Sequence, residues 1–253
     1  MDKIKGVVDV MSSTWTSSAS LWRGTNASPA KKQPEKLLEL YDYEYCPYCR
    51  LVREVLTELD LDAMVYPCPE GGERFRSVME NAGGKQQYPY LVDPNTGKSL
   101  YESQGIIAYL YKTYKGKNTV PRAHKIDLLG SYVSTLSRGY RGKTAQVSKQ
   151  AKQPLVLYSF ESSPFSRLVR EKLCELELPY ILRNTGKASL KDLGPPIVRK
   201  VLFPDLPVSG RNRIELMERA GKVQLPYLID PNTNTEMFES DDIVDYLLAT
   251  YAL

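Results

Sequence analysis

Histidine is almost absent from this chain of 253 residues, which has one, His124. A single histidine argues against a Cys–His nucleophile pair and against a metal site built from several histidines. Cysteine is scarce as well. Four of them, Cys46, Cys49, Cys68 and Cys174, are too few to form a disulfide scaffold in a chain of this length. Cysteines in a reducing compartment more often serve redox or metal chemistry.

The sequence also lacks long apolar runs and a strong charge of one sign. No stretch of about 18 apolar residues is present, so no transmembrane helix is expected. The net charge of +4, without a long basic run, argues against a nucleic-acid partner. The N-terminus has no apolar core of a secretory signal, whereas residues 11–34 are free of acidic residues and weakly resemble an organelle transit peptide. We therefore expect a cytoplasmic protein, with an organelle such as the plastid stroma as the alternative.

What the sequence does contain is an internal repeat. A segment of 24 residues that begins at Leu38 matches a segment that begins at Leu155 at 14 positions, with a shift of 117. The Arg-Leu-Val-Arg-Glu inside this segment is identical in both copies. The cysteines of the first copy are serines in the second, Cys46 matching Ser163 and Cys49 matching Ser166. The chain is therefore a duplication with one dithiol site and one hydroxyl site, and we interpret it as a pseudo-dimer within one chain.

A second matching block shows how far the repeat extends. Pro89–Thr96 matches Pro226–Thr233 with a shift of 137, which places an insertion of 20 residues in the second copy. Irregular chain rich in proline between Arg183 and Arg211 is where we expect it. The boundaries that follow are residues 1–35 for an N-terminal helix and linker, 36–115 for the first domain, 116–153 for a helical linker and 154–253 for the second domain.

Each copy has the same expected order of elements: strand, helix, strand, helix, two strands and helix. Short apolar runs indicate the buried strands, and the proline of the repeated motif suits the first turn of a helix. The paired strands are joined by Asp-Pro-Asn-Thr turns. This order predicts an α/β sandwich on a small mixed sheet. The expected ranges are Leu37–Tyr41, Ala63–Tyr66 and Ser103–Tyr114 in the first copy, and Leu155–Phe160, Tyr180–Leu182 and Asp241–Tyr251 in the second.

The segments before the two copies match more faintly. Trp22-Arg23-Gly24 aligns with Tyr140-Arg141-Gly142 at a shift of 118, and apolar residues upstream align in the same register with helical spacing. We interpret these segments as two amphipathic helices, one leading each domain. The alternative is a Ser-rich disordered arm and a plain linker.

These motifs resemble known glutathione-linked families. Cys46-Pro47-Tyr48-Cys49 has the active-site sequence of dithiol glutaredoxins, and Glu102-Ser103 resembles the glutathione-binding segment of glutathione transferase N-terminal domains. Ser163-Pro164-Phe165-Ser166-Arg167 resembles the catalytic-serine segment of plant tau-class transferases. The resemblance covers residues 37–115 and 154–253. It implies two tandem thioredoxin-like domains, each preceded by an amphipathic helix, with a second domain in place of the all-helical C-terminal domain of true transferases.

The dithiol is suited to thiol chemistry because a helix N-terminus stabilises a thiolate. A free cysteine has a pKa near about 8.5, which falls at such a position, so Cys46 is the expected nucleophile. Cys49, one turn further in, would resolve a mixed disulfide, and Arg50 would add positive charge. Half of a zinc site, an iron–sulfur cluster shared with glutathione between two copies, and an inert pair stay open as alternatives. Cys68 and Cys174 are expected to be structural.

The resemblance also implies a glutathione site. Pro89 and Pro226 would be cis-prolines, so that Tyr88 and Leu225 present their backbones to the cysteinyl unit of glutathione. Ser at the cap position of the last helix, with the preceding glutamate, would bind the γ-glutamyl unit. The predicted site consists of the catalytic candidates Cys46, Cys49 and Ser163 and the glutathione-binding candidates Tyr48, Tyr88, Pro89, Glu102, Ser103, Leu225, Pro226, Glu239 and Ser240, with no metal.

The leading functional hypothesis is a glutathione-linked thiol–disulfide oxidoreductase, with glutathione as co-substrate and a disulfide or glutathionylated protein as substrate. One alternative is a transferase or peroxidase that uses glutathione at Ser163 or Cys46. The other is a non-catalytic binding or assembly protein that reuses two thioredoxin-like folds, for which loss of Cys46 would have no effect.

Overall fold

The computed structural model describes residues 3–19, 21–121, 128–136, 138–188 and 207–253. The expected order of elements is confirmed in both copies. The first copy contains β1 (Leu38–Asp42), α2 (Pro47–Glu58), β2 (Ala63–Pro67), α3 (Arg76–Gly83), β3 (Tyr90–Asp93), β4 (Lys98–Tyr101), α4 (Ser103–Leu110) and the π-helical turn η1 (Tyr111–Lys115). The second contains β5 (Leu155–Ser159), α7 (Pro164–Glu175), β6 (Tyr180–Asn184), α9 (Arg211–Ala220), β7 (Tyr227–Asp230), β8 (Thr235–Phe238) and α10 (Ser240–Tyr251). His124 and most of the expected insertion lie outside the described residues.

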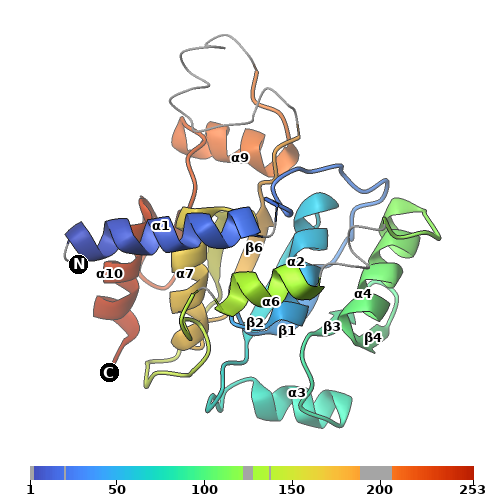
Figure 1. Ribbon diagram of the computed structural model, residues 1–253, viewed down its shortest axis with the longest axis horizontal. Coiled ribbons are helices and arrows are strands. Elements are labelled where there is room, and N and C mark those ends of the chain that lie inside the picture. Colours follow the sequence, from blue (N-terminus) through green and yellow to red (C-terminus); the bar gives the residue numbers. More distant parts are fainter. Residues whose placement is uncertain (1–2, 20, 122–127, 137, 189–206) are drawn as a thin grey trace.

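All strands join in one sheet of eight, in the order β4-β3-β1-β2-β6-β5-β7-β8. Within the first copy, β1 runs parallel to β2 and antiparallel to β3, and the second copy repeats this pattern. Such a mixed four-stranded unit with helices on its faces is a thioredoxin-like domain. The two units meet edge to edge through β2 and β6, at the centre of the sheet (Figure 1).

The junction between the copies is symmetric. In the antiparallel pairing of β2 with β6, Met64 lies opposite Ile181. These two residues are also equivalent positions of the repeat, at the shift of 117. A pseudo-two-fold axis therefore passes between them, and the single chain has the arrangement of a symmetric dimer.

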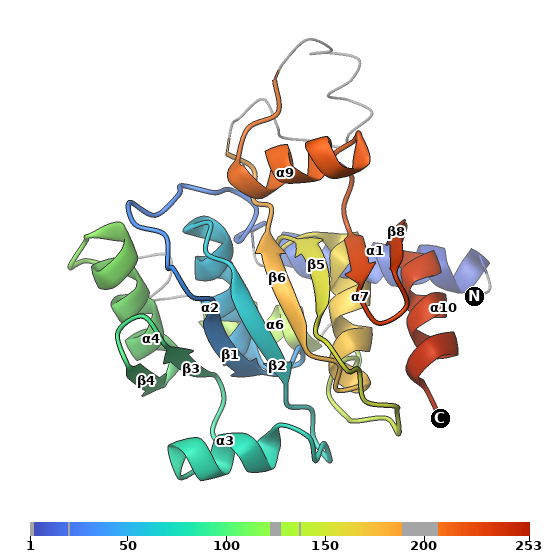
Figure 2. The same ribbon diagram turned by 180° about the vertical axis from the view of Figure 1, so that it is seen from behind.

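Helices cover both faces of the sheet, as the alternation of side chains along a strand requires. Leu40 of β1 points into a core formed with α2 and α4, while its neighbour Tyr41 packs on the other face against Met79 of α3. The second copy repeats this division, since Leu157 packs with α7 and α10 whereas Tyr158 contacts Leu216 of α9. Figure 2 shows α3 and α9 at opposite ends of the sheet.

The two expected leader helices are confirmed as α1 (Lys3–Ala19) and α6 (Leu128–Leu136), and each lies on the other copy. Ser13 of α1 donates a hydrogen bond of 2.8 Å to the carbonyl of Pro164, at the start of α7. Ser131 of α6, its equivalent at the shift of 118, donates one of 2.7 Å to the carbonyl of Pro47, at the start of α2. The leader helices therefore cross over, and they lie over the layer formed by α2 and α7 (Figure 1).

A glycine follows each leader helix where the chain passes the opposite copy. Gly24 accepts a hydrogen bond of 3.2 Å from the backbone N–H of Ser162, and Gly142 accepts one of 3.4 Å from that of Tyr45. A Cβ atom at Gly24 would lie 2.7 Å from Cβ of Glu161, and one at Gly142 would lie 2.7 Å from Cβ of Glu44. This close approach accounts for the faint Arg-Gly match before each copy.

The described residues form these two α/β copies and their leader helices, and they contain no separate all-helical domain. In this part of the chain, no helix combines the length and the apolar character needed to cross a membrane.

Candidate active site: the dithiol at the start of helix α2

Cys46 occupies the N-cap position of α2, and Pro47 begins the helix. The backbone at Cys46 is extended, with φ −94° and ψ 118°, so its Sγ atom turns toward the free N–H groups of the first turn. The backbone N–H of Cys49 donates to this sulfur over 3.2 Å. Both thiols are buried, Cys46 with 3% of its surface exposed and Cys49 with none.

The surroundings of the two thiols set their pKa values apart. Burial works against ionisation of Cys46, but hydrogen bonds from the Cys49 thiol and backbone, together with the positive charge of Arg53, lower its pKa below the ordinary cysteine value. Burial, the same hydrogen bond and the negative charge on Cys46 raise the pKa of Cys49. Cys46 is thus the thiol that ionises first, and Cys49 is the proton donor beside it.

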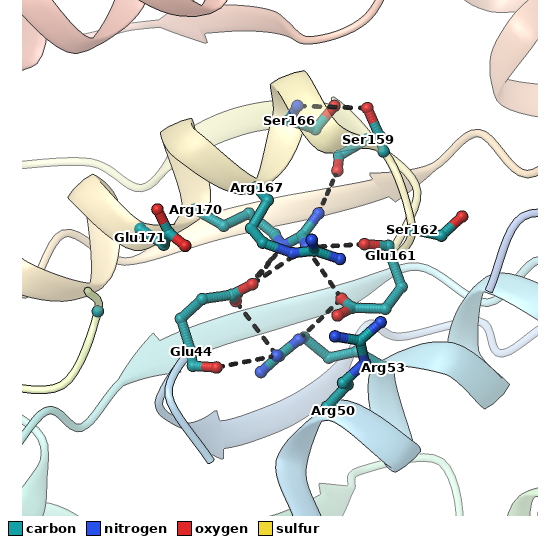
Figure 3. Close-up of polar contacts among 12 residues, drawn as sticks. Glu44, Arg50, Arg53, Ser159, Glu161, Ser162, Ser166, Arg167, Arg170 and Glu171 are labelled. Carbon is teal, nitrogen blue, oxygen red and sulfur yellow. Dashed lines mark hydrogen bonds and ion pairs between the residues drawn. The ribbon is translucent and has the colours of Figure 1, made fainter. Parts of the chain in front are cut away.

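The cation that acts on Cys46 is Arg53, and the expectation for Arg50 was wrong. Arg50 turns along the helix to Glu54, with Nε and Oε1 3.1 Å apart. Arg53 is 2% exposed and forms ion pairs with Asp42, with Glu44 at 3.3 Å and with Glu161 of the second copy at 3.0 Å. Figure 3 shows how the second copy reaches Arg53. A motif read along one copy gives no signal for this contact between copies.

The peptide bonds before Pro89 and Pro226 are both cis, as the resemblance implied. Tyr88, which precedes Pro89, packs edge-on against Tyr43 with ring centroids 5.8 Å apart. Burial, followed by the nearby Cys68 and, to a smaller extent, Cys49, raises the pKa of the Tyr88 hydroxyl, while Arg76 opposes this shift. The structure therefore brings the cis-proline loop close to the dithiol.

The start of α4 differs from the expected capping arrangement. Glu102, not Ser103, occupies the N-cap position, with φ 68° and no side-chain cap hydrogen bond. Because the chain turns through this positive φ, Ser103 becomes the first helical residue and is buried. The Glu102 carboxylate instead accepts a hydrogen bond from the side-chain amide of Gln87, which directly precedes Tyr88. Gln87 was missed by the sequence analysis and ties the cis-proline loop to Glu102.

Helix α6 forms a wall beside the dithiol that the sequence analysis did not assign to the site. The hydroxyl groups of Tyr132 and Tyr48 are hydrogen bonded at 3.0 Å, and their rings meet edge-on with centroids 5.9 Å apart. Tyr48 is 40% exposed and Tyr132 is 38% exposed. Cys46, which is almost fully buried, acts electrostatically on Tyr132, so this tyrosine pair lies close to the dithiol.

The second copy repeats the backbone geometry with different side chains. Ser163 caps α7, and its Oγ accepts a hydrogen bond of 3.2 Å from the N–H of Ser166. Glu239 has φ 68° and accepts from Gln224, as Glu102 does from Gln87. Ser240 is again the first helical residue rather than the cap. Phe165 stands where the first copy has Tyr48, so no hydroxyl pair forms there.

The remaining cysteines are buried, and Cys68 lies beside Tyr88. Burial raises the pKa of the Cys68 thiol and that of the Cys174 thiol. Cys174 Sγ lies 3.4 Å from the carbonyl oxygen of Gly142, at the crossing of the chain. Among the described residues, no group of three or more His, Cys, Asp or Glu side chains is placed to hold a metal ion.

The fold and this geometry define a tandem thioredoxin-like protein with a dithiol in one copy and serines in the other. The family model described as glutathione S-transferase, N-terminal domain, matches the chain over residues 40–118 and 157–253. The chain therefore belongs to this family, which supports a glutathione-related function in general terms. No curated protein matches the sequence.

Solved structures of glutathione transferases match more weakly. A glutathione transferase of Bombyx mori is 26% identical over 34% of this chain and 40% of that chain, with a TM-score of 0.29. A trimeric glutathione transferase of Leishmania is 13% identical over 86% of this chain and 67% of that chain, also with a TM-score of 0.29. The matched region thus spans less than half of the Bombyx mori enzyme.

Proposed function

We propose that the protein is a glutathione-linked thiol–disulfide oxidoreductase that acts through Cys46. The observation that carries the proposal is the pair of opposed thiols at the start of α2, where the pKa of Cys46 is lowered and that of Cys49 is raised. A thiolate is the nucleophile in disulfide exchange, and a protonated neighbour stabilises it until it is needed.

In the first step, the Cys46 thiolate attacks the glutathionyl sulfur of a mixed disulfide between glutathione and a substrate thiol. The substrate S–S bond breaks, a bond between Cys46 and the glutathionyl sulfur forms, and the substrate leaves as a thiolate that takes a proton from water. Tyr88 and Pro89 would bind the cysteinyl unit, and Glu102 and Ser103 the γ-glutamyl unit.

Glutathione then completes the cycle. A second glutathione thiolate attacks the glutathionyl sulfur, which yields oxidised glutathione and returns Cys46 as a thiolate. In the dithiol route, Cys49 loses its proton and attacks the Cys46 sulfur, which releases glutathione and leaves a Cys46–Cys49 disulfide. Two further glutathione molecules reduce that disulfide, so glutathione is the only reductant required.

The second copy supports the dithiol electrostatically in this proposal. Glu161 lies 3.0 Å from Arg53 Nε, and Arg53 is the cation that lowers the pKa of Cys46. Ser163 is the cap residue of α7. Phe165, the equivalent of Tyr48, has no hydroxyl group. A second glutathione site at Leu225, Pro226, Glu239 and Ser240 shares the backbone geometry of the first.

The test is glutathione-dependent reduction of a small glutathione mixed disulfide, with wild type compared with Cys46→Ser, Cys49→Ser and Ser163→Ala. We expect Cys46→Ser to abolish turnover, while Cys49→Ser retains the route resolved by glutathione. Ser163→Ala is the matched control, because it alters the equivalent position of the other copy, and it should keep wild-type activity. An inactive wild type, or activity that survives Cys46→Ser, would contradict the proposal. Conjugation of a small electrophile that depends on Ser163 would favour the transferase alternative.

A further inference from the structure

A cluster of buried charges lies under the crossed leader helices, at the pseudo-two-fold axis. Its centre is built from equivalent residues of the two copies, since Arg53 and Arg170 each pair with both Glu44 and Glu161. These four side chains are all buried (Figure 3). A buried cation is costly unless a carboxylate lies against it, and the symmetric centre meets this requirement.

Around this centre, equivalent glutamates of the two copies form ion pairs with different arginines. In the first copy, Glu54 lies 3.1 Å from Arg50, one helical turn away. In the second copy, the equivalent Glu171 pairs with Arg138, which lies in the chain that follows α6. Arg138 donates two hydrogen bonds of 2.6 Å to the Glu171 carboxylate. Arg167, the equivalent of Arg50, therefore has no glutamate left on its own helix.

Arg167 is consequently the exception in the cluster. Its hydrogen bonds go to neutral oxygens of α1, with 2.8 Å to the carbonyl of Ser13, 3.2 Å to the Ser13 hydroxyl and 3.1 Å to the Ser17 hydroxyl. Within the described part of the chain, six other arginines of the cluster and six carboxylates form ion pairs with one another. Arg167 is 2% exposed, so it is a buried cation whose described partners include no carboxylate.

A small cavity adjoins this cation. Its volume is about 10 Å³, and five arginine and three glutamate side chains line it, among them Arg50 and Arg167. A space of this size holds one particle about as large as a water molecule, for which about 10–15 Å³ is required. Burial, followed by the positive charge of Arg50, lowers the pKa of Arg167 to about 9, although the charges of Glu161 and Glu44 act in the opposite direction.

We propose that this cavity binds one monovalent inorganic anion, chloride or another halide, against the guanidinium group of Arg167. The single unmatched arginine sets the charge of the ligand, and the small volume of the cavity favours a monatomic anion over a carboxylate or a larger oxyanion. The anion completes the charge balance of the interface between the copies, so it stabilises the folded chain. The cavity does not include the two thiols in its lining, but Arg53, which lowers the pKa of Cys46, lines it.

The experiment uses the full chain, prepared in sodium gluconate and titrated with sodium chloride at constant ionic strength. The ³⁵Cl NMR line should broaden in the presence of wild type, and Arg167→Met should lose this broadening. Arg219→Met is the control, because Arg219 forms an exposed ion pair with Glu236 and lies outside the cavity lining. It should broaden the line as wild type does. Chloride should also raise the wild-type Tm by about 2–4 °C, through preferential binding to the folded state.

Two further measurements separate the anion site from a folding defect. If Arg167→Met fails to fold, Arg167→Lys keeps the charge and should retain the ³⁵Cl broadening in weaker form. Crystals of wild type soaked in bromide should show an anomalous peak between Arg50 and Arg167. The proposal is overturned if wild type leaves the ³⁵Cl line unchanged, if Arg167→Met broadens it equally, or if the bromide peak is absent and only water occupies the cavity.

Discussion

Arg53 and Glu161 form an ion pair of 3.0 Å although they belong to different copies of the repeat. The equivalent pair, Arg170 and Glu44, lies 3.0 Å apart across the same axis. The arginines come from the identical Arg-Leu-Val-Arg-Glu segments. These segments therefore provide the ion pairs that join the two copies. Because Arg53 also lowers the pKa of Cys46, the interface between the copies and the chemistry of the dithiol share one side chain.

Replacing Glu161 with Gln should destabilise the protein strongly. Although burial alone would raise it, Arg170 and Arg53 lower the pKa of Glu161 to about 2, so the carboxylate is ionised in the folded state. Removing one partner of a buried ion pair costs about 3–5 kcal/mol, because the remaining charges stay buried. Urea unfolding monitored by circular dichroism measures the loss.

The control for this change is Glu70→Gln. Glu70 pairs with Lys143 at 3.4 Å, and half of its side chain is exposed. Exposed pairs contribute about 0–1 kcal/mol, so the two variants should differ clearly in their free energies of unfolding. Equal losses would contradict a structural role for the charged cluster. The stabilisation by Glu161 is present above the unfolded pKa of about 4.3 and should be lost as the pH falls toward 2.

The rate of Cys46 alkylation should depend on pH with a midpoint below that of an ordinary cysteine. Alkylation requires the thiolate, and a lowered pKa means that the thiolate is present at lower pH. Cys49→Ala removes a thiol that donates a hydrogen bond to Cys46, so the midpoint should rise. Cys49→Ser keeps a hydroxyl donor and should shift it less. Iodoacetamide kinetics read by mass spectrometry provide the curves, and a midpoint unchanged in Cys49→Ala would contradict the hydrogen-bond explanation.

Replacing Tyr132 with Ala should expose the dithiol. Tyr132 is hydrogen bonded to Tyr48 at 3.0 Å, and Cys46 is only 3% exposed beside them. We expect faster alkylation of Cys46 at a pH where its thiolate is fully formed, by a few-fold. Thr14→Ala is the matched control, because Thr14 is equivalent to Tyr132 and donates to the carbonyl of Val10 on its own helix. If both variants react at the wild-type rate, Tyr132 does not limit access.

Gly142→Ala should destabilise the crossing of the chain more than Gly97→Ala destabilises a turn. Both glycines have φ of 69°, where an L side chain costs about 1–2 kcal/mol. A Cβ atom at Gly142 would also lie 2.7 Å from Cβ of Glu44, whereas one at Gly97 meets nothing within 4 Å. Chemical denaturation of the two variants measures the difference. An equal loss of stability would show that the approach at Gly142 relaxes without cost.

The repeat and the family resemblance made several local features predictable. Pro47 at the first turn of α2, the Asp-Pro-Asn turns between paired strands and the cis bonds before Pro89 and Pro226 depend on neighbours in sequence or on a motif. The capping role assigned to Ser103 was wrong because the positive φ of Glu102 moves the helix start by one residue. Side-chain type predicts that a helix begins there, but backbone conformation decides which residue caps it.

The two α/β copies, the dithiol at a helix start and the replacement of both cysteines by serines could be predicted, because they follow from local pattern and from the repeat. The pairing of β2 with β6, the crossing of each leader helix to the other copy and the contact of Arg53 with Glu161 could not. A buried charge must find its partner in space, and the pairing of two strand edges sets that geometry for residues more than a hundred positions apart.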